Sequence, residues 1–328
     1  MTEEKAPWIT FRPEIKVLDC TVRDGGLINN HKFEDNFVKA VYDTCIEAGI
    51  DYMELGYKNS GRLFQRDDFG DWKFCTEDDM RRIVGDNEGG KIKLTAMADA
   101  EKSDYKTDIL PKSESVLDCI RVATYVHQLN VAVDMIKDAH DKGYETTCNI
   151  MAISTVGEKE IDQALDVLRE TPADVVVVVD SYGTLNYEQI RNLVNKYKGA
   201  LEGTGKEVGI HTHNNQQLAF ANTIEALIHG ANRLDATMMG LGRGAGNCCM
   251  ELLLGFLRNP KFHLRPVYKL LQDYVYPLQK EGGLEWGALV PYNITGYLNQ
   301  HPRAAMRVLD SDDRDEFVKF YDSCVADI

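Results

Sequence analysis

The chain has 328 residues, 44% of them hydrophobic, and its 37 basic and 52 acidic side chains give a formal net charge of −15. This length allows one large α/β domain with an appendage, or two ordinary domains. The acidic balance and the lack of a basic run argue against a nucleic-acid or anionic-membrane partner, because binding a polyphosphate needs clustered Lys and Arg.

Two features bear on the compartment. The first eight residues show no charged-then-apolar leader, and no apolar run approaches the roughly 18 residues of a membrane span, so a cytoplasmic protein is expected. The eight cysteines are scattered without CxxC spacing, which is typical of reduced, buried thiols. The adjacent Cys248 and Cys249 are expected to pack in the interior rather than to form a redox pair.

Strand-like and helix-like segments alternate along the chain from Ile15 onward. The run Val175–Val179 is apolar on both faces, as expected for a parallel strand between helices and a packed interior. A helix is predicted after Gly157, with Glu158 and Glu160 in its first turn, where carboxylates favour the helix dipole. Eight strands are predicted, at residues 15–20, 52–56, 92–97, 119–123, 146–151, 175–180, 208–213 and 233–237.

Eight consecutive βα units predict a (β/α)8 TIM barrel over residues 14–258, with the active site at the carboxyl ends of its strands. A doubly wound open sheet is the structural alternative, but the GxGxxG phosphate motif is absent after the first strand. Residues 259–328 carry five prolines between helical patterns, so a helical C-terminal extension is expected there.

The seventh predicted strand ends in Val208-Gly-Ile-His-Thr-His-Asn-Asn215. Side chains alternate along a strand, so His211 and His213 are expected on one face, where two imidazoles can hold a divalent metal. Taken alone, the pair also fits two histidines bonded to neighbours at a polar strand end.

Two further segments join these histidines at the predicted rim of the barrel. The first strand leads into Asp19-Cys-Thr-Val-Arg-Asp-Gly-Gly26, and the eighth is followed by Gly240-Leu-Gly-Arg-Gly-Ala-Gly-Asn247. A carboxylate, two imidazoles and an amide oxygen form a nitrogen and oxygen site that suits Mg²⁺, Mn²⁺ or Zn²⁺.

These three motifs, in this order, resemble the metal-dependent TIM-barrel aldolases and lyases related to hydroxymethylglutaryl-CoA lyase. The closest resemblance is to the 4-hydroxy-2-oxovalerate aldolase branch, with weaker similarity in the tail around residues 291–302. The resemblance implies that Asp24, His211 and His213 bind the metal, with Asn247 as a further oxygen ligand or close neighbour. Mn²⁺ or Mg²⁺ is the expected ion, with Zn²⁺ as an alternative. Asp19 is expected to accept hydrogen bonds from a backbone group or an arginine rather than to bind the metal.

Roles are also expected for side chains around the metal, those of Arg23 and Ser181 from the resemblance and those of Glu54 and Arg121 from their places on the predicted strands. Arg23 corresponds to the catalytic arginine that faces the carbonyl or enolate oxygen of the substrate. Glu54 is expected to pair with Arg23 and to belong to the substrate site. Ser181 is expected to donate a hydrogen bond to the carboxylate of a 2-oxo acid, although an ordinary turn role also fits. Arg121 is expected to serve packing or internal hydrogen bonding.

One position departs from the aldolase pattern. In that branch a histidine three residues after the metal-binding aspartate takes the hydroxyl proton of the substrate, and this chain has Leu27 there, which cannot accept a proton. Tyr292 fits the branch best as a substitute catalytic group. The other substitutes are a metal-bound water and the side chains of His31, Tyr57, Lys58 and His127.

The leading hypothesis is a divalent-metal-dependent aldolase-type carbon-carbon lyase that acts on a 2-oxo acid through a metal-stabilised enolate. One alternative is a Claisen-type enzyme that condenses an acyl-CoA on the same scaffold. Another is a catalytically inactive binding subunit. The stretch from Arg23 to His31 also resembles aldolase-like barrels found among sugar and polysaccharide genes, so a larger substrate remains open.

The expected partner is a small 2-oxo acid, with neither nucleic acid nor membrane involved. A homodimer is expected only by analogy with related barrels. In the aldolase branch the tail docks a dehydrogenase, so the resemblance raises a dehydrogenase as a further partner.

Overall fold

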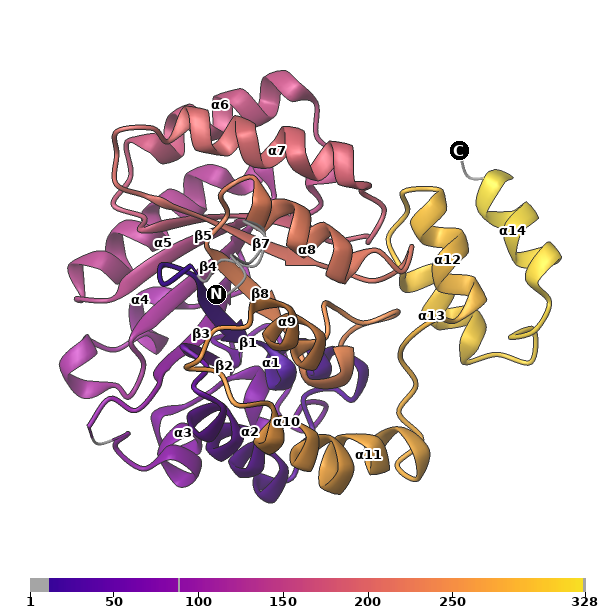
Figure 1. Cartoon of the computed structure of the whole chain (residues 1–328), viewed down its shortest axis with the longest axis horizontal. Coiled ribbons are helices and arrows are strands. Elements are labelled where there is room, and N and C mark those ends of the chain that lie inside the picture. Colours follow the sequence, from indigo (N-terminus) through magenta and orange to yellow (C-terminus); the bar gives the residue numbers. More distant parts are fainter. Residues whose placement is uncertain (1–11, 88, 327–328) are drawn as a thin grey trace, which may run out of the picture.

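The structure is a computed structural model that describes residues 12–87 and 89–326. Eight parallel strands form a closed barrel in sequence order, and pairing of the first strand with the eighth completes the ring (Figure 1). The predicted (β/α)8 fold is therefore confirmed, and the alternative of an open, doubly wound sheet is wrong. The strands are β1 (Lys16–Asp19), β2 (Tyr52–Tyr57), β3 (Lys93–Asp99), β4 (Cys119–Thr124), β5 (Glu145–Ile150), β6 (Val175–Asp180), β7 (Glu207–Thr212) and β8 (Arg233–Ala236).

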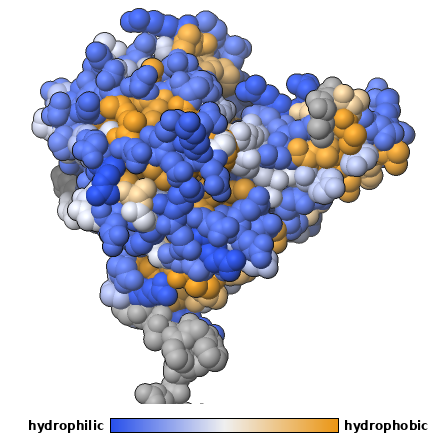
Figure 2. All heavy atoms as spheres, turned by 90° about the horizontal axis from the view of Figure 1, so that it is seen from above, coloured by the Kyte–Doolittle hydropathy of each residue, from blue (hydrophilic) through white to orange (hydrophobic). Residues whose placement is uncertain are grey.

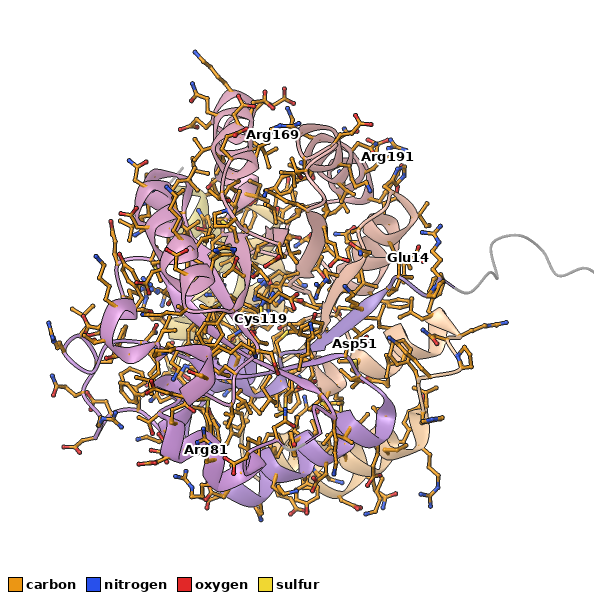
Figure 3. All side chains as sticks on the ribbon, turned by 90° about the vertical axis from the view of Figure 1, so that its left-hand side faces the viewer. Glu14, Asp51, Arg81, Cys119, Arg169 and Arg191 are labelled. Carbon is orange, nitrogen blue, oxygen red and sulfur yellow. The ribbon has the colours of Figure 1, made fainter. Side chains whose placement is uncertain are left out.

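Helices surround the barrel. Figure 3 shows Cys119, at the start of β4, near the centre of the molecule, whereas Arg81, Arg169 and Arg191 lie at the periphery on outer helices. The helices between Thr21 and Leu270 are α1 (Thr21–Gly25), α2 (Asp35–Ala48), α3 (Glu77–Val84), α4 (Tyr105–Asp108), α5 (Leu129–Asp141), α6 (Glu158–Arg169), α7 (Tyr187–Ala200), α8 (Ala219–Ile228), α9 (Met250–Leu257) and α10 (Leu264–Leu270).

The local sequence explains why these elements form. The first turn of α6 begins after Gly157 as predicted, and the Glu160 carboxylate accepts a hydrogen bond from the Gly157 N–H at 3.2 Å. In β6, Val176 and Val178 join the core under the helices, whereas Val175, Val177 and Val179 pack together in a separate cluster. Both faces of β6 are therefore buried, as its unbroken valine run indicates.

The segment after α9 divides into two parts. The first comprises α10, a π-helical turn η8 (Leu271–Val275) and α11 (Tyr276–Lys280); α10 packs on α2 and α9, and its Val267 and Leu270 belong to the main core. The second comprises α12 (Val290–Tyr297), α13 (Arg303–Leu309) and α14 (Phe317–Ala326), which share a small core of their own and form a lobe beside the barrel (Figure 1). The C-terminal extension is therefore helical, and the domain boundary after residue 258 stays a prediction.

The surface of this lobe carries apolar groups. Figure 2 shows apolar surface on the lobe, and α14 exposes Phe317, Val318 and Val325.

Among the described residues, no helix combines the length and the apolar character that crossing a membrane would require. Cys248 is buried and Cys249 is partly buried, and both are free thiols, in agreement with the expectation that they do not form a redox pair.

Candidate active site

The chain leaves β1 through the single-turn helix α1, which places Arg23 and Asp24 in the interior. Asp19 fixes this turn, because its carboxylate accepts hydrogen bonds from the Thr21 N–H at 3.1 Å and the Thr21 hydroxyl at 2.6 Å. The Thr21 hydroxyl oxygen in turn accepts the Met238 N–H at 2.9 Å, which ties β1 to the loop after β8. Burial raises the pKa of Asp19 to about 7. The expectation that Asp19 accepts backbone hydrogen bonds is confirmed.

The three predicted protein ligands converge above the barrel. His211 Nε2 lies 3.4 Å from Asp24 Oδ2, and His213 Nε2 lies 3.7 Å from Asp24 Oδ1. One ligand atom from each residue lies within 4.8 Å of the other two, and all three side chains are buried. The strand alternation therefore brings both imidazoles to one carboxylate.

Hydrogen bonds behind the rings orient the two imidazoles. His211 Nδ1 lies 3.1 Å from Asp235 Oδ2, and His213 Nδ1 lies 3.1 Å from the carbonyl oxygen of Asp180. A carbonyl oxygen only accepts, so Nδ1 of His213 carries the proton, and the Asp235 carboxylate favours the same tautomer in His211. Both Nε2 lone pairs then face Asp24. This is the usual arrangement of histidines that bind a metal.

Asn247 completes the group from the glycine-rich loop. Its Nδ2 lies 3.2 Å from His211 Nε2, and its Oδ1 is buried without a hydrogen-bond partner among the described residues. The Nε2 atom of His213 is also buried without one. A Cβ on Gly242 would lie 2.0 Å from Asn247 Oδ1 and 2.9 Å from Asp24 Oδ1, so only glycine leaves room for this group.

The protonation states also suit a cation. Burial alone raises the pKa of Asp24, but the Arg23 guanidinium and His213 outweigh it, so the pKa lies well below its usual range. Burial lowers the pKa of His213 to about 4. Both groups are therefore deprotonated near neutral pH. A bound cation would also supply the missing partner of the two buried atoms without hydrogen bonds, Asn247 Oδ1 and His213 Nε2. The residues present fit a divalent ion held by nitrogen and oxygen atoms.

A second group of metal-ligating types lies close by, formed by Cys20, His211 and Asp235. Burial raises the pKa of the Cys20 thiol well above its usual value, so this thiol stays protonated and is a poor ligand. The Nδ1 atom of His211 is already bonded to Asp235. The site around Asp24 is therefore the better cation site.

Arg23 is held by carboxylates on two sides. Its Nε lies 2.7 Å from Glu54 Oε2, which confirms the predicted pair, and its Nη1 contacts Asp24. Arg121 also donates to Glu54 Oε2, at 3.0 Å, and pairs with Asp235. Together these groups form a closed ring of ionic hydrogen bonds and short contacts in the order Asp24, Arg23, Glu54, Arg121, Asp235 and His211.

The ring borders a cavity with about 410 Å³ of free space, including its opening to solvent. Its polar lining includes Arg23, Asp24, His211 and His213, together with Ser181. The Ser181 hydroxyl oxygen accepts the Ala152 N–H at 2.8 Å, so the hydroxyl hydrogen is free to be donated to a ligand. The apolar part of the wall is a cluster of Leu27, Tyr57, Met97, Ala123 and Met151.

Of the protein groups named as substitutes for the missing histidine, only Tyr57 lines this cavity. His31 is buried behind it, with its ring centroid 5.3 Å from that of Tyr57, and burial lowers the pKa of His31 to about 3. Lys58 points elsewhere and donates to the Cys75 carbonyl at 2.6 Å. His127 is exposed and stacks on Tyr125.

Two expected site residues lie outside the cavity wall. Tyr292 packs in the small core of the C-terminal lobe, and a Cβ on Gly244 would lie 3.3 Å from its ring. This position does not support the expected catalytic role of Tyr292. Glu54 is fully buried beneath Arg23, so it orients that guanidinium rather than contacts a substrate.

Sequence reasoning missed two residues of the site. Asp235 follows Leu234 inside a predicted barrel strand, where a charged side chain is itself a signal of an internal partner. Arg243 is the one charged residue in the segment Gly240–Asn247, and it lines the cavity.

Comparison with known proteins agrees with this geometry. The chain is 31% identical over 255 residues to the oxaloacetate decarboxylase of Mycobacterium tuberculosis, covering 76% of this chain and 72% of that protein. It is 29% identical over 262 residues to the 4-hydroxy-2-oxovalerate aldolase of Pelotomaculum thermopropionicum, covering 79% and 75%. The crystal structure of the N-terminal domain of a candidate aldolase from Bacteroides vulgatus matches with a TM-score of 0.75 at 26% identity, covering 92% of this chain and 98% of that one.

The family model described as HMGL-like matches residues 14–270, which includes the whole barrel and every candidate metal ligand. The resemblance inferred from the three motifs is thereby confirmed. The chain belongs to the HMGL-like family.

Proposed function

We propose that this protein is a divalent-metal-dependent, aldolase-type carbon-carbon lyase that acts on a 2-oxo acid. The class of carbon-carbon lyase is confirmed by its relatives, which are named as an aldolase and a decarboxylase. The observation that carries the proposal is the convergence of Asp24 with the Nε2 atoms of His211 and His213, beside the fixed guanidinium of Arg23, at the wall of a cavity.

Asp24, His211 and His213 would hold the ion, with the side-chain oxygen of Asn247 as a further ligand. When bound, a divalent ion supplies Lewis-acid chemistry that withdraws electrons from the carbonyl and carboxylate of a 2-oxo acid. The set of carboxylate, amide and imidazole suits Mn²⁺ or Mg²⁺, and two imidazoles favour Mn²⁺ of these two. Zn²⁺ also binds such a set.

Arg23 stabilises the negative charge that develops on the enolate oxygen when the carbon-carbon bond breaks. Its guanidinium is held by Asp24 and Glu54, and the residue is only 4% exposed, so its orientation is fixed before the substrate binds. A donor fixed in advance in a water-poor site costs little reorganisation during the reaction. Ser181 donates its hydroxyl hydrogen to the carboxylate of the substrate and so orients it.

Retro-aldol cleavage also needs a base for the hydroxyl proton, and Leu27 cannot be that base. Tyr57 reaches the cavity, but burial raises the pKa of its phenol well above the usual value. Near neutral pH Tyr57 is therefore a proton donor.

This observation favours decarboxylation of a 2-oxo acid with a carboxylate on C3 as a second candidate reaction. The bond between C3 and the carboxylate breaks, its electron pair forms the enolate, CO₂ leaves, and C3 then takes up one proton. No hydroxyl has to be deprotonated. The apolar wall around Leu27 and Met97 disfavours a carboxylate relative to neutral CO₂, which assists this step.

Deuterium exchange into the methyl group of pyruvate tests the shared enolate chemistry. Mass spectrometry of pyruvate incubated in D₂O with protein and Mn²⁺ or Mg²⁺ should show exchange that EDTA abolishes. Arg23→Met should lower the rate strongly, and Arg303→Met, a change to an exposed arginine of the tail, serves as its control. Metal binding without any exchange in the unaltered protein would contradict the proposal.

Product analysis then separates the two reactions. Aldol cleavage of 4-hydroxy-2-oxovalerate releases acetaldehyde, whereas decarboxylation of oxaloacetate releases CO₂ above the rate given by the metal alone. The homodimer, the dehydrogenase partner and the cytoplasmic location stay predictions.

A further inference from the structure

Arg243 holds a central position at the candidate site. Its backbone N–H donates to Asp24 Oδ1 at 3.0 Å, and its Nη2 donates to the carbonyl oxygen of Ser181 at 3.2 Å. The backbone of Arg243 thus lies at a candidate metal ligand and its guanidinium at the residue that follows β6, and Arg243 lines the cavity.

The pairing of Arg243 differs from that of the other two arginines in the site. Arg23 and Arg121 each pair with two buried carboxylates. No carboxylate pairs with the Arg243 guanidinium among the described residues, and its Nε is buried without a hydrogen-bond partner there. Arg243 is partly buried, and a cationic group held largely away from water is costly without a counter-ion, so the missing partner is expected to be a ligand.

The charge balance of the site points to an anionic ligand. Three carboxylates, Asp24, Glu54 and Asp235, face the guanidinium groups of Arg23 and Arg121, which leaves one negative charge in the ring. A divalent ion would then add positive charge that the ring itself does not offset. The carboxylate of a substrate, and the enolate that develops beside it, would supply the negative charge that balances this excess positive charge.

The C-terminal lobe supports the loop that carries Arg243. Gly244 has a φ of +66°, and its backbone packs against the Tyr292 ring, where an added Cβ would lie 3.3 Å from that ring. Asn215 Nδ2 donates to the Tyr292 carbonyl at 3.3 Å and joins the lobe to the segment after β7. Tyr292 therefore fixes the loop from behind while the Arg243 side chain faces the cavity.

We propose that Arg243 is the specificity-determining receptor for the carboxylate of the 2-oxo acid, acting together with the Ser181 hydroxyl. This inference rests on the proposed function and adds the group that selects an acid. A guanidinium offers parallel N–H groups that match a carboxylate, and Nε is free to be one of them. The site therefore selects 2-oxo acids against thioesters and neutral ketones.

Oxalate, a planar dianion that mimics the enolate form of pyruvate, is the probe for this assignment. Calorimetric titration of oxalate into the Mg²⁺-loaded protein should give a Kd that rises about 10-fold to 100-fold in Arg243→Gln. Arg243→Lys should recover part of the affinity, because it keeps the charge. Arg303→Gln, on an exposed arginine of α13, is the matched control and should bind oxalate like the unaltered protein.

Three readouts separate charge recognition from support of the loop. Mn²⁺ affinity should be unchanged in Arg243→Gln, because the backbone N–H to Asp24 remains. The KM for pyruvate in deuterium exchange should rise far more than kcat falls. The oxalate Kd of the unaltered protein should weaken with added NaCl, and that of Arg243→Gln should respond less.

An unchanged oxalate Kd in Arg243→Gln, or equal losses in the Lys and Gln variants, would overturn the assignment. Failure of the proposed function gives a different result. In that case the unaltered protein binds oxalate through Arg243 but does not exchange the methyl protons of pyruvate for deuterium.

Discussion

His211 Nδ1 lies 3.1 Å from Asp235 Oδ2, and the same carboxylate oxygen contacts the Arg121 guanidinium. Burial alone lowers the pKa of His211, but the neighbouring carboxylates of Asp235 and Asp24 outweigh it and raise the pKa. Asp235 thus fixes both the orientation and the tautomer of a candidate ligand, although it lies behind the ring.

Asp235→Asn should therefore weaken Mn²⁺ binding by about 10-fold to 100-fold, the usual effect of losing a partner behind a metal ligand. Isothermal titration with Mn²⁺ measures this. Asp19→Asn is the matched control, because Asp19 is also a buried acid at the base of the site but contacts Thr21 and neither histidine. Equal Mn²⁺ affinities in Asp235→Asn and the unaltered protein would show that Asp235 does not support the ligand.

Leu27→His should create aldol cleavage that the unaltered protein lacks or performs slowly. Leu27 lines the same cavity as the two histidines, so an imidazole there faces the substrate. A positioned base contributes about 10²-fold or more, measured as acetaldehyde released from 4-hydroxy-2-oxovalerate. Leu27→Met keeps the wall apolar and should show no gain. If the imidazole leaves cleavage unchanged while pyruvate exchange persists, proton removal from the hydroxyl is not the missing step.

The buried Asp19 should make stability depend on pH. Its folded pKa of about 7 lies above the ordinary value of 3.8, so between these values the folded protein holds a proton that the unfolded chain has lost. The free energy of unfolding contributed by this group is fully present below pH 3.8 and is lost as the pH rises through about 7.

Asp19→Asn removes the titrating group and should flatten this part of the profile. Urea unfolding at several pH values, with metal absent, compares the two proteins. A decline of the same steepness in Asp19→Asn would assign the pH dependence to other groups.

Tyr292→Phe should leave pyruvate exchange and cleavage unchanged, because the ring packs against Gly244 and does not line the cavity. Tyr292→Ala should destabilise the protein by about 3–5 kcal/mol, the usual cost of truncating a buried aromatic residue. It should also raise the KM for pyruvate, because the loop of Arg243 loses its support. A large loss of kcat in Tyr292→Phe would instead support the catalytic role that the sequence predicts for Tyr292.

The repeating features of the fold were predictable, because each depends on local patterns. The valine run of β6 is buried on both faces, and the α6 helix begins after Gly157 as its acidic first turn indicates. The convergence of His211 and His213 followed from strand alternation. The pairing of Arg23 with Glu54 followed from their places at the ends of the first two predicted strands.

The remaining features depend on contacts between distant segments. Asp235 supports His211 only because β7 and β8 are adjacent in the closed barrel, and no local pattern at Asp235 specifies that partner. Tyr292 matches the family position by sequence, but the orientation of its side chain depends on how the C-terminal lobe packs on the loop at Gly244. Arg243 stands out only once the carboxylates around it are known to be paired with other arginines.

The most direct test of the account is the metal dependence of deuterium exchange into pyruvate, measured together with bound metal, in the unaltered protein and in His213→Gln. The account predicts that exchange rises with Mn²⁺ occupancy, saturates as the site fills, and is lost with the bound ion in His213→Gln. Exchange that persists in EDTA, or an ion retained at full affinity in His213→Gln, would contradict it.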